Sequence, residues 1–200
     1  MSTKLAADSN EQQSRSTAPG ITVCRIDTPL GTMVAAATDK GLAILEFGSL
    51  AQIKKNVDHV ARQLQTDWIM QQHSISHPIL LQTIRELEAY YAGTLKIFTV
   101  PLDFSALGNE FARSVWQCLI QIPYGVTWTY KQQAEMMNNP LAIRAIASAN
   151  GRNPIAVIIP CHRVIGSNGS LTGYAGGVEK KRWLLLMEKS NSPVQAGRLF

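Results

Sequence analysis

The segment that most constrains this chain is an apolar run, residues 155–159, that ends at Pro160 and is followed at once by Cys161 and His162. Such a run predicts a strand buried in the core, and the proline predicts a turn at its end. The fold must therefore bury this run and bring a thiol out beside an imidazole. A cysteine held there next to a base is a candidate nucleophile, although a lone cysteine is as often a small buried hydrophobic residue.

The composition is that of a globular chain of one or two small domains. The 200 residues are 46% hydrophobic. No apolar run approaches the roughly 18 to 20 residues that a membrane-spanning helix needs, and the first residues lack the apolar core of a signal peptide. The three cysteines, Cys24, Cys118 and Cys161, contain no CxxC spacing and predict neither a disulfide framework nor a metal site. We therefore expect a cytoplasmic protein that uses no metal.

The net charge of +5 is unevenly distributed along the chain. Residues 1–100 contain nine Lys or Arg and nine Asp or Glu, whereas residues 101–200 contain ten and five. The excess positive charge thus lies in the half that carries Cys161. It suits a polyanionic partner such as nucleic acid, but charge alone fits an ordinary basic surface equally well.

The pattern of the chain predicts an α+β fold with a small N-terminal α/β domain and a mostly helical C-terminal domain. Residues 1–19 are polar and are expected to form a disordered tail. Residues 20–104 are expected to form the N-terminal domain, with strands over 21–27, 32–38 and 42–47 and helices over 51–64 and 79–91. His59, His73 and His77 have no spacing that indicates a shared metal ion.

Residues 105–190 are expected to form the C-terminal domain, and residues 191–200 a flexible tail. A helix is predicted from a cap at Gly108 or Asn109 to about Gln121, before Pro123. Helices over 130–137 and from Pro140 to about Ala149 are joined by a short turn, which predicts a helix-turn-helix. The second of these is slim, with four alanines and a single charge, Arg144. Taken alone, it fits tight packing in the core better than contact with DNA.

Residues 153–166, NPIAVIIPCHRVIG, closely resemble the active-site segment of the O6-alkylguanine-DNA alkyltransferases. The resemblance continues through residues 169–177 (GSLTGYAGG) and 181–188 (KRWLLLME). It reaches back through residues 111–116 (FARSVW) and 124–130 (YGVTWTY). The N-terminal half is similar only loosely, mainly at residues 28–31 (TPLG).

The resemblance implies direct-reversal DNA repair, in which the alkyl group of O6-alkylguanine moves irreversibly to Cys161. The implied partner is double-stranded DNA, bound by the second helix of the helix-turn-helix through the minor groove. We expect a monomer that uses no metal, nucleotide or organic cofactor and reacts once. Activity on O4-alkylthymine and cooperative binding are left open.

The same resemblance implies roles for individual residues. A relay Cys161–water–His162–Glu188 would form the thiolate, and Asn153 would brace the turns around it. On the DNA side, Tyr130 would push on the target phosphate and Arg144 would fill the stack after the base is turned out. The residues expected around the guanine base are Tyr174, Val164 and Ala175. Without the family, Tyr130 is a core aromatic residue, Glu188 a solvated one, and Asn153 only the start of a turn.

Three other functions stay open at this point. A non-catalytic binder of alkyl damage would share this fold but carry another residue in place of Cys161. A transcriptional regulator would use the helix-turn-helix to prefer one DNA sequence. A redox thiol protein is disfavoured by the absence of CxxC.

Overall fold

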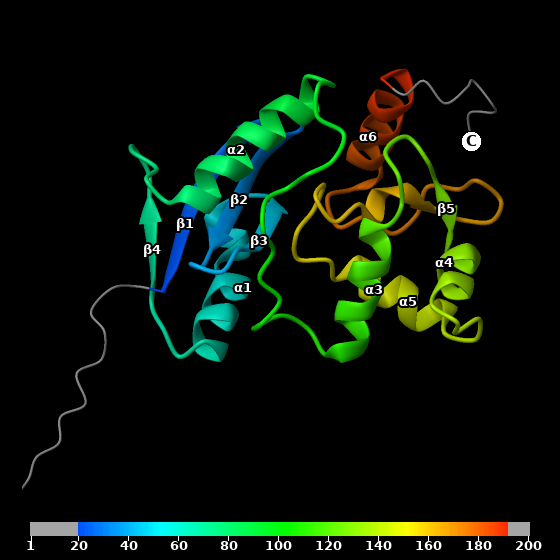
Figure 1. Cartoon of the computed structure of the whole chain (residues 1–200), viewed down its shortest axis with the longest axis horizontal. Coiled ribbons are helices and arrows are strands. Elements are labelled where there is room, and N and C mark those ends of the chain that lie inside the picture. The colour runs from blue at the N-terminus through cyan, green and yellow to red at the C-terminus, as the bar shows by residue number, and fades with distance from the viewer. Residues whose placement is uncertain (1–19, 192–200) are drawn as a thin grey trace, which may run out of the picture.

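The computed structural model describes residues 20–191, and these form two halves that lie side by side (Figure 1). The N-terminal half is a sheet with two helices, and the C-terminal half is mostly helical, which confirms the predicted α+β class. The tail predicted for 1–19, and residues 192–200 of the tail predicted for 191–200, lie outside the described residues. None of the helices within residues 20–191 has the length and apolar character required to cross a bilayer.

The N-terminal half is a four-stranded sheet in the order β3-β2-β1-β4. Its elements are β1 (Ile21–Thr28), β2 (Gly31–Ala37), β3 (Leu42–Phe47), α1 (Leu50–Gln63), β4 (Trp68–Gln71) and α2 (Pro78–Tyr91). The three predicted strands and both predicted helices are present within one or two residues. The strand β4 was not predicted, because four residues with little alternation carry no strand signal; it pairs in parallel with β1.

The outer edge of β3 is covered by segments of chain that come from elsewhere. Leu45 donates its amide to Pro154 O at 2.8 Å and accepts from Ala156 N at 2.7 Å. Farther along the same strand, Leu42 N donates to Pro101 O at 2.8 Å. Unpaired strand edges are normally covered or blunted in this way. The sheet therefore holds directly the segment that leads to Cys161.

The C-terminal half contains three helices that pack together, a two-stranded parallel ladder and a last helix. Its elements are α3 (Glu110–Ile120), β5 (Trp128–Thr129), α4 (Tyr130–Met136), α5 (Ile143–Gly151), η1 (Cys161–Arg163), β6 (Val164–Ile165) and α6 (Val178–Ser190). The helix α3 begins as predicted at Asn109, whose side chain accepts from Ala112 N at 2.9 Å.

The second helix of the helix-turn-helix begins at Ile143, so the predicted start at Pro140 was wrong. Asn138 has a φ of 52°, and Ala142 N donates to Asn139 O at 3.0 Å. This turn takes up Pro140 before the helix begins. The helix then ends at Gly151, two residues beyond the predicted end.

The strand predicted over residues 155–159 was also wrong. Only Ile155 makes a ladder contact, with Leu45, and the chain then turns back so that Ile159 N bonds Ile155 O at 3.0 Å. Val157 has a φ of 73°, a conformation that costs a β-branched residue of the order of 1–3 kcal/mol. All five residues are buried. Burial explains the apolar run, but an apolar run does not distinguish a strand from a buried turn.

We expect Asn109→Ala to lower the free energy of unfolding by about 1 kcal/mol, because the first turn of α3 loses its side-chain cap. Urea denaturation measures the change. Asn109→Ser, which keeps a capping oxygen, should stay close to the wild type. An Asn109→Ala protein as stable as the wild type would contradict this assignment.

Candidate active site

Cys161 opens the short turn η1 and is 7% exposed. Its Sγ lies 3.2 Å from Asn153 Nδ2, and the same amide nitrogen donates to Ile159 O at 2.7 Å. Asn153 Oδ1 accepts from Ile155 N at 3.0 Å. One side chain thus bonds both ends of the buried turn and aims a donor at the sulfur. The structure thus brings Cys161 and Asn153 into contact, and the roles implied for them stay predictions.

His162 and Glu188 form a fully buried pair, with Nε2 of the imidazole 2.8 Å from Oε1 of the carboxylate. Ionised Glu188 can only accept, so Nε2 carries the hydrogen and Nδ1 is the acceptor nitrogen. Nδ1 is buried and has no hydrogen-bond partner among the described residues. The imidazole is therefore oriented by the carboxylate on one side and available as a base on the other.

Glu188 accepts hydrogen bonds from four residues that lie in three separate parts of the chain. Besides His162, Arg163 donates from Nη2 at 2.9 Å to Oε1 and from Nε at 3.0 Å to Oε2. Tyr90 of α2 donates its hydroxyl to Oε1 at 2.6 Å, and Gly125 donates its amide to Oε2 at 3.1 Å. The sequence analysis predicted neither Tyr90 nor Gly125 as a member of the site, and no local pattern marks them.

The pKa shifts indicate an ionised Glu188 beside a neutral His162 and a protonated Cys161. Burial raises the pKa of Glu188, but His162 and Arg163 outweigh it, and the pKa lies well below its usual value. Burial lowers the pKa of His162 more than Glu188 raises it. Burial likewise raises the pKa of the Cys161 thiol, against the smaller effects of Asn153 and Lys181. Arg163 neutralises the carboxylate without a proton on His162, so the group of Glu188, Arg163 and His162 carries no net charge.

Lys181 is a third residue of the site that was not predicted from the sequence. Its ammonium is buried and donates to Val164 O at 2.6 Å and to Thr172 O at 2.8 Å. Burial lowers its pKa from 10.5 to about 8, although Cys161 acts in the opposite direction. A signal was present, because Lys181 shares the buried stripe of α6 with Leu184, Leu185 and Glu188 at helical spacing.

Tyr174 lies beside the imidazole, with the ring centroids 6.4 Å apart in an edge-on arrangement with His162. Its hydroxyl is buried without a partner among the described residues. Burial, and then the charge of Cys161, raise its pKa well above the usual value. Ala175 is exposed next to it. At Gly176, a Cβ atom would lie only 2.8 Å from the Tyr174 ring, so the loop requires glycine there.

Among the described residues, Tyr130 and Arg144 make no hydrogen bond to Cys161, His162 or Glu188, although burial and, to a smaller extent, the charge of Cys161 raise the pKa of Tyr130. Tyr130 is half-buried at the start of α4, with its hydroxyl 3.5 Å from Thr172 O. Arg144 is exposed on α5. The two helices are joined by a buried amide pair, in which Asn150 Nδ2 donates to Gln133 Oε1 at 2.7 Å. The exposed side of this region includes Leu141, which is 97% exposed.

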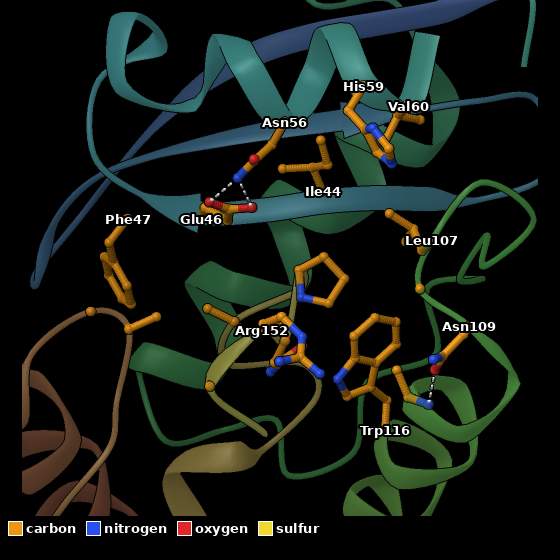
Figure 2. A pocket seen from close by; sticks show the side chains of 18 residues that line it. Ile44, Glu46, Phe47, Asn56, His59, Val60, Leu107, Asn109, Trp116 and Arg152 are labelled. Carbon is orange, nitrogen blue, oxygen red and sulfur yellow. Dashed lines mark hydrogen bonds between the residues drawn. The ribbon is translucent and has the colours of Figure 1, made fainter. Parts of the chain in front are cut away.

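A cavity of about 530 Å³ lies between the sheet and the C-terminal half, and Pro154 and Ala156 contribute to its wall (Figure 2). Glu46, bonded by Asn56 Nδ2 at 3.0 Å, lies on one side of it, and Trp116 and Arg152 lie on the other. Asn153 contributes to its wall, whereas Cys161, His162 and Glu188 do not line it. Within residues 20–191, no three His, Cys, Asp or Glu side chains are grouped so that they could hold a metal ion.

Comparison with known proteins gives the same family for both halves. Residues 24–104 match the family described as 6-O-methylguanine DNA methyltransferase, ribonuclease-like domain, and residues 110–190 match its DNA binding domain. A methylated-DNA–protein-cysteine methyltransferase of Methanosarcina barkeri is 43% identical over 166 residues, which are 83% of this chain and 96% of the relative.

Solved structures agree with the sequence matches. The Mycobacterium tuberculosis O6-methylguanine methyltransferase superposes with a TM-score of 0.72 at 38% identity, covering 88% of this chain and 96% of that one. The Mycobacterium tuberculosis OGT in complex with DNA superposes with a TM-score of 0.70 at 38% identity, covering 86% and 96%.

We expect Glu188→Gln to lower the free energy of unfolding by about 3–5 kcal/mol, because Arg163 would be left buried without a counter-charge. Urea denaturation at neutral pH measures the loss. The matched control is Glu179→Gln in the exposed first turn of α6, which should change stability by no more than about 0.5 kcal/mol. Equal stabilities of the two variants would mean that the ion pair is not formed.

Proposed function

This chain belongs to the 6-O-methylguanine DNA methyltransferase family, and we propose that Cys161 is the acceptor in the DNA repair reaction it performs, alkyl transfer from DNA to a protein cysteine. The observation that carries the proposal is the buried cluster around the thiol. Asn153 faces Sγ, and the oriented imidazole of His162 has an Nδ1 that makes no hydrogen bond within residues 20–191. A nucleophile, a base and a group that orients the base are the parts that such chemistry requires.

The proton of the thiol would pass to His162 through one water. Cys161 and His162 make no direct hydrogen bond among the described residues, so a bridging molecule is needed between Sγ and Nδ1. The water would accept from the thiol and donate to Nδ1, and Glu188 would stabilise the imidazolium that results. The Asn153 amide and the Lys181 charge both favour the thiolate once it forms.

The thiolate would then attack the alkyl carbon in line with the bond to O6 of guanine. The S–C bond forms as the C–O bond breaks, and the bonding electrons stay on the guanine oxygen. A donor aimed at that oxygen stabilises the charge that develops there. We assign this role to the Tyr174 hydroxyl, which is buried and protonated and makes no hydrogen bond in the described part of the chain.

The product on the protein would be an S-alkylcysteine. Water does not readily cleave a thioether, and the cluster holds no second thiol beside Cys161. Of the other two cysteines, Cys24 is buried in β1 and Cys118 is buried in α3. Each molecule would therefore react once.

The base would be read in the space around Tyr174, Val164 and Ala175. Val164 O already accepts from Lys181, but a carbonyl has a second lone pair that a guanine N–H could use. The exposed Ala175 leaves its backbone accessible. The damaged nucleotide has to leave the stack to arrive here, at a cost of a few kcal/mol.

The helix pair α4 and α5 would bind double-stranded DNA carrying O6-alkylguanine through the minor groove. The exposed residues Arg144, Ala145 and Ser148 give α5 a slim surface with one long cation. A slim helix suits the narrower groove. We assign Arg144 to the gap left by the extruded base and Tyr130 to the target phosphate. A single chain has every part of this site, which favours a monomer.

A non-catalytic damage binder is the second candidate, and the presence of Cys161 within the His162–Glu188 cluster weighs against it. The two candidates differ in one measurement, intact-protein mass spectrometry after mixing with a duplex that contains O6-methylguanine. We expect one added methyl group per chain, mapped to Cys161. Cys161→Ser should stay unmodified while it still binds the duplex, and Cys118→Ser should be methylated like the wild type. Binding without any mass change in the wild type would favour the damage binder.

We expect Arg144→Ala to slow transfer from duplex DNA about 10- to 100-fold, because the cost of extruding the base is no longer offset. Transfer from the free base O6-methylguanine needs no extrusion and should be unchanged. Single-turnover kinetics with both substrates separate the two effects. Arg62→Ala, which removes an arginine from the N-terminal half, serves as the charge control. A similar loss on both substrates would contradict the assigned role of Arg144.

A further inference from the structure

Among the described residues, one side chain of the N-terminal half donates a hydrogen bond to Glu188. Tyr90 lies near the end of α2 and is fully buried. Its hydroxyl donates to Glu188 Oε1 at 2.6 Å, across 98 positions of sequence. A distance of this size is typical of an O–H donor on a carboxylate, which is about twice as strong as a neutral hydrogen bond. The contact therefore does more than fill space.

Tyr90 and His162 share one oxygen atom. Oε1 accepts from the Tyr90 hydroxyl at 2.6 Å and lies 2.8 Å from His162 Nε2. A carboxylate oxygen that already accepts a strong hydrogen bond carries less charge for the next donor. Glu188 therefore stabilises the protonated form of His162 less when the Tyr90 hydroxyl is present than it would if that hydroxyl were absent.

The tyrosine is held rigidly in the position that this bond requires. Its ring packs against Phe98, Tyr91 and Tyr124, with centroid distances of 5.1, 5.5 and 5.9 Å. Burial, and then the charge of Glu188, raise its pKa well above the usual value, so the hydroxyl stays protonated. Because the ring is fixed and the hydroxyl keeps its proton, Tyr90 always donates a hydrogen bond to Glu188.

We propose that Tyr90 is a positioning residue for alkyl transfer, which holds Glu188 against His162 and keeps the imidazole free to accept the thiol proton. The inference rests on the proposed function, because it assigns to His162 the role of base. It also gives the N-terminal half an indirect part in the reaction, through Glu188. Tyr90 touches neither the substrate nor the sulfur and acts through Glu188 alone.

The charged and titratable groups around the pair come from every element packed against it. The same turn, η1, contributes Cys161 and Arg163, and α6 contributes Lys181. The Tyr124 ring packs on Arg163, with its centroid 5.7 Å from the guanidinium carbon, and Tyr174 lies edge-on to His162. All of these stay in place when only the Tyr90 oxygen is removed, so a change in the titration of His162 can be assigned to that oxygen.

The test is the pH dependence of single-turnover methyl transfer in Tyr90→Phe. Transfer is lost as the pH falls and His162 takes up a proton, and burial places this loss below the ordinary histidine pKa of about 6.5. Without the Tyr90 hydroxyl, Glu188 holds the imidazolium more tightly. The pH at which the transfer rate falls on the acidic side of the profile, here called the acid limb, should therefore rise by about half a unit or more. The rate near neutral pH should also fall about tenfold, because Glu188 is held less well; removing the partner that orients a metal-binding histidine has an effect of this size.

Two control variants separate this effect from packing. Tyr91→Phe removes a hydroxyl that makes no bond to Glu188 among the described residues, and Phe98→Leu loosens the packing of Tyr90 but keeps its hydroxyl. Neither should move the acid limb, although Phe98→Leu should lower stability. The ¹⁵N chemical shifts of His162, followed with pH, should show the shift in Tyr90→Phe and not in the two controls.

A variant of opposite sign keeps the test valid if Tyr90→Phe fails to fold. Site-specific 3,5-difluorotyrosine at position 90 makes the hydroxyl a stronger donor at nearly the same size, and it should move the acid limb to lower pH. An unshifted limb in either folded variant, with the wild type active, overturns the inference. A wild type that transfers no methyl group overturns the proposed function instead, so the two failures are distinguishable.

Discussion

The buried carboxylate of Glu188 is the interaction on which the rest of the structure depends. A charge at this depth is tolerated only when it is paired and its oxygens are hydrogen-bonded. The donors come from α2, from the loop after α3 and from η1, through Tyr90, Gly125, His162 and Arg163. Three stretches of chain that are distant in sequence therefore have to meet at one point of α6. The packing of the two halves and the geometry of the site are consequences of the same requirement.

This arrangement keeps Cys161 in its protonated, poorly nucleophilic form in the free protein. With Glu188 neutralised by Arg163, the imidazole stays neutral and the thiol keeps its proton. Oxidants attack the thiolate and prefer exposed sulfur, and the sulfur here is largely covered. For a protein proposed to react once, a resting thiol avoids losing the molecule to side reactions. In the proposed mechanism, His162 acts as the base once a water connects Sγ with its Nδ1.

Most of the regular structure was predictable from the sequence, since it follows from local signals. The first three strands, which end at Phe47, are short β-rich runs separated by short turns. The helices carry apolar stripes and caps, as at Asn109. Cys161, His162, Asn153 and Glu188 were expected together only through the resemblance to a family. Spacing alone could not join Glu188 to His162. The roles assigned to Tyr130, Arg144, Tyr174, Val164 and Ala175 in binding remain predictions.

What the sequence could not reveal depends on contacts between distant segments. Tyr90 is one of two consecutive tyrosines, and nothing local indicates which of them reaches Glu188. The turn at Val157 looks like a strand, because burial and not backbone pairing selects its residues. These features also limit how the molecule can be divided. A fragment that begins at residue 105 would lose β3, which pairs with the turn before Cys161, together with the phenol that bonds Glu188. The smallest unit able to assemble this site therefore includes the sheet. The boundary between the halves separates two kinds of secondary structure, but it does not separate two independent units.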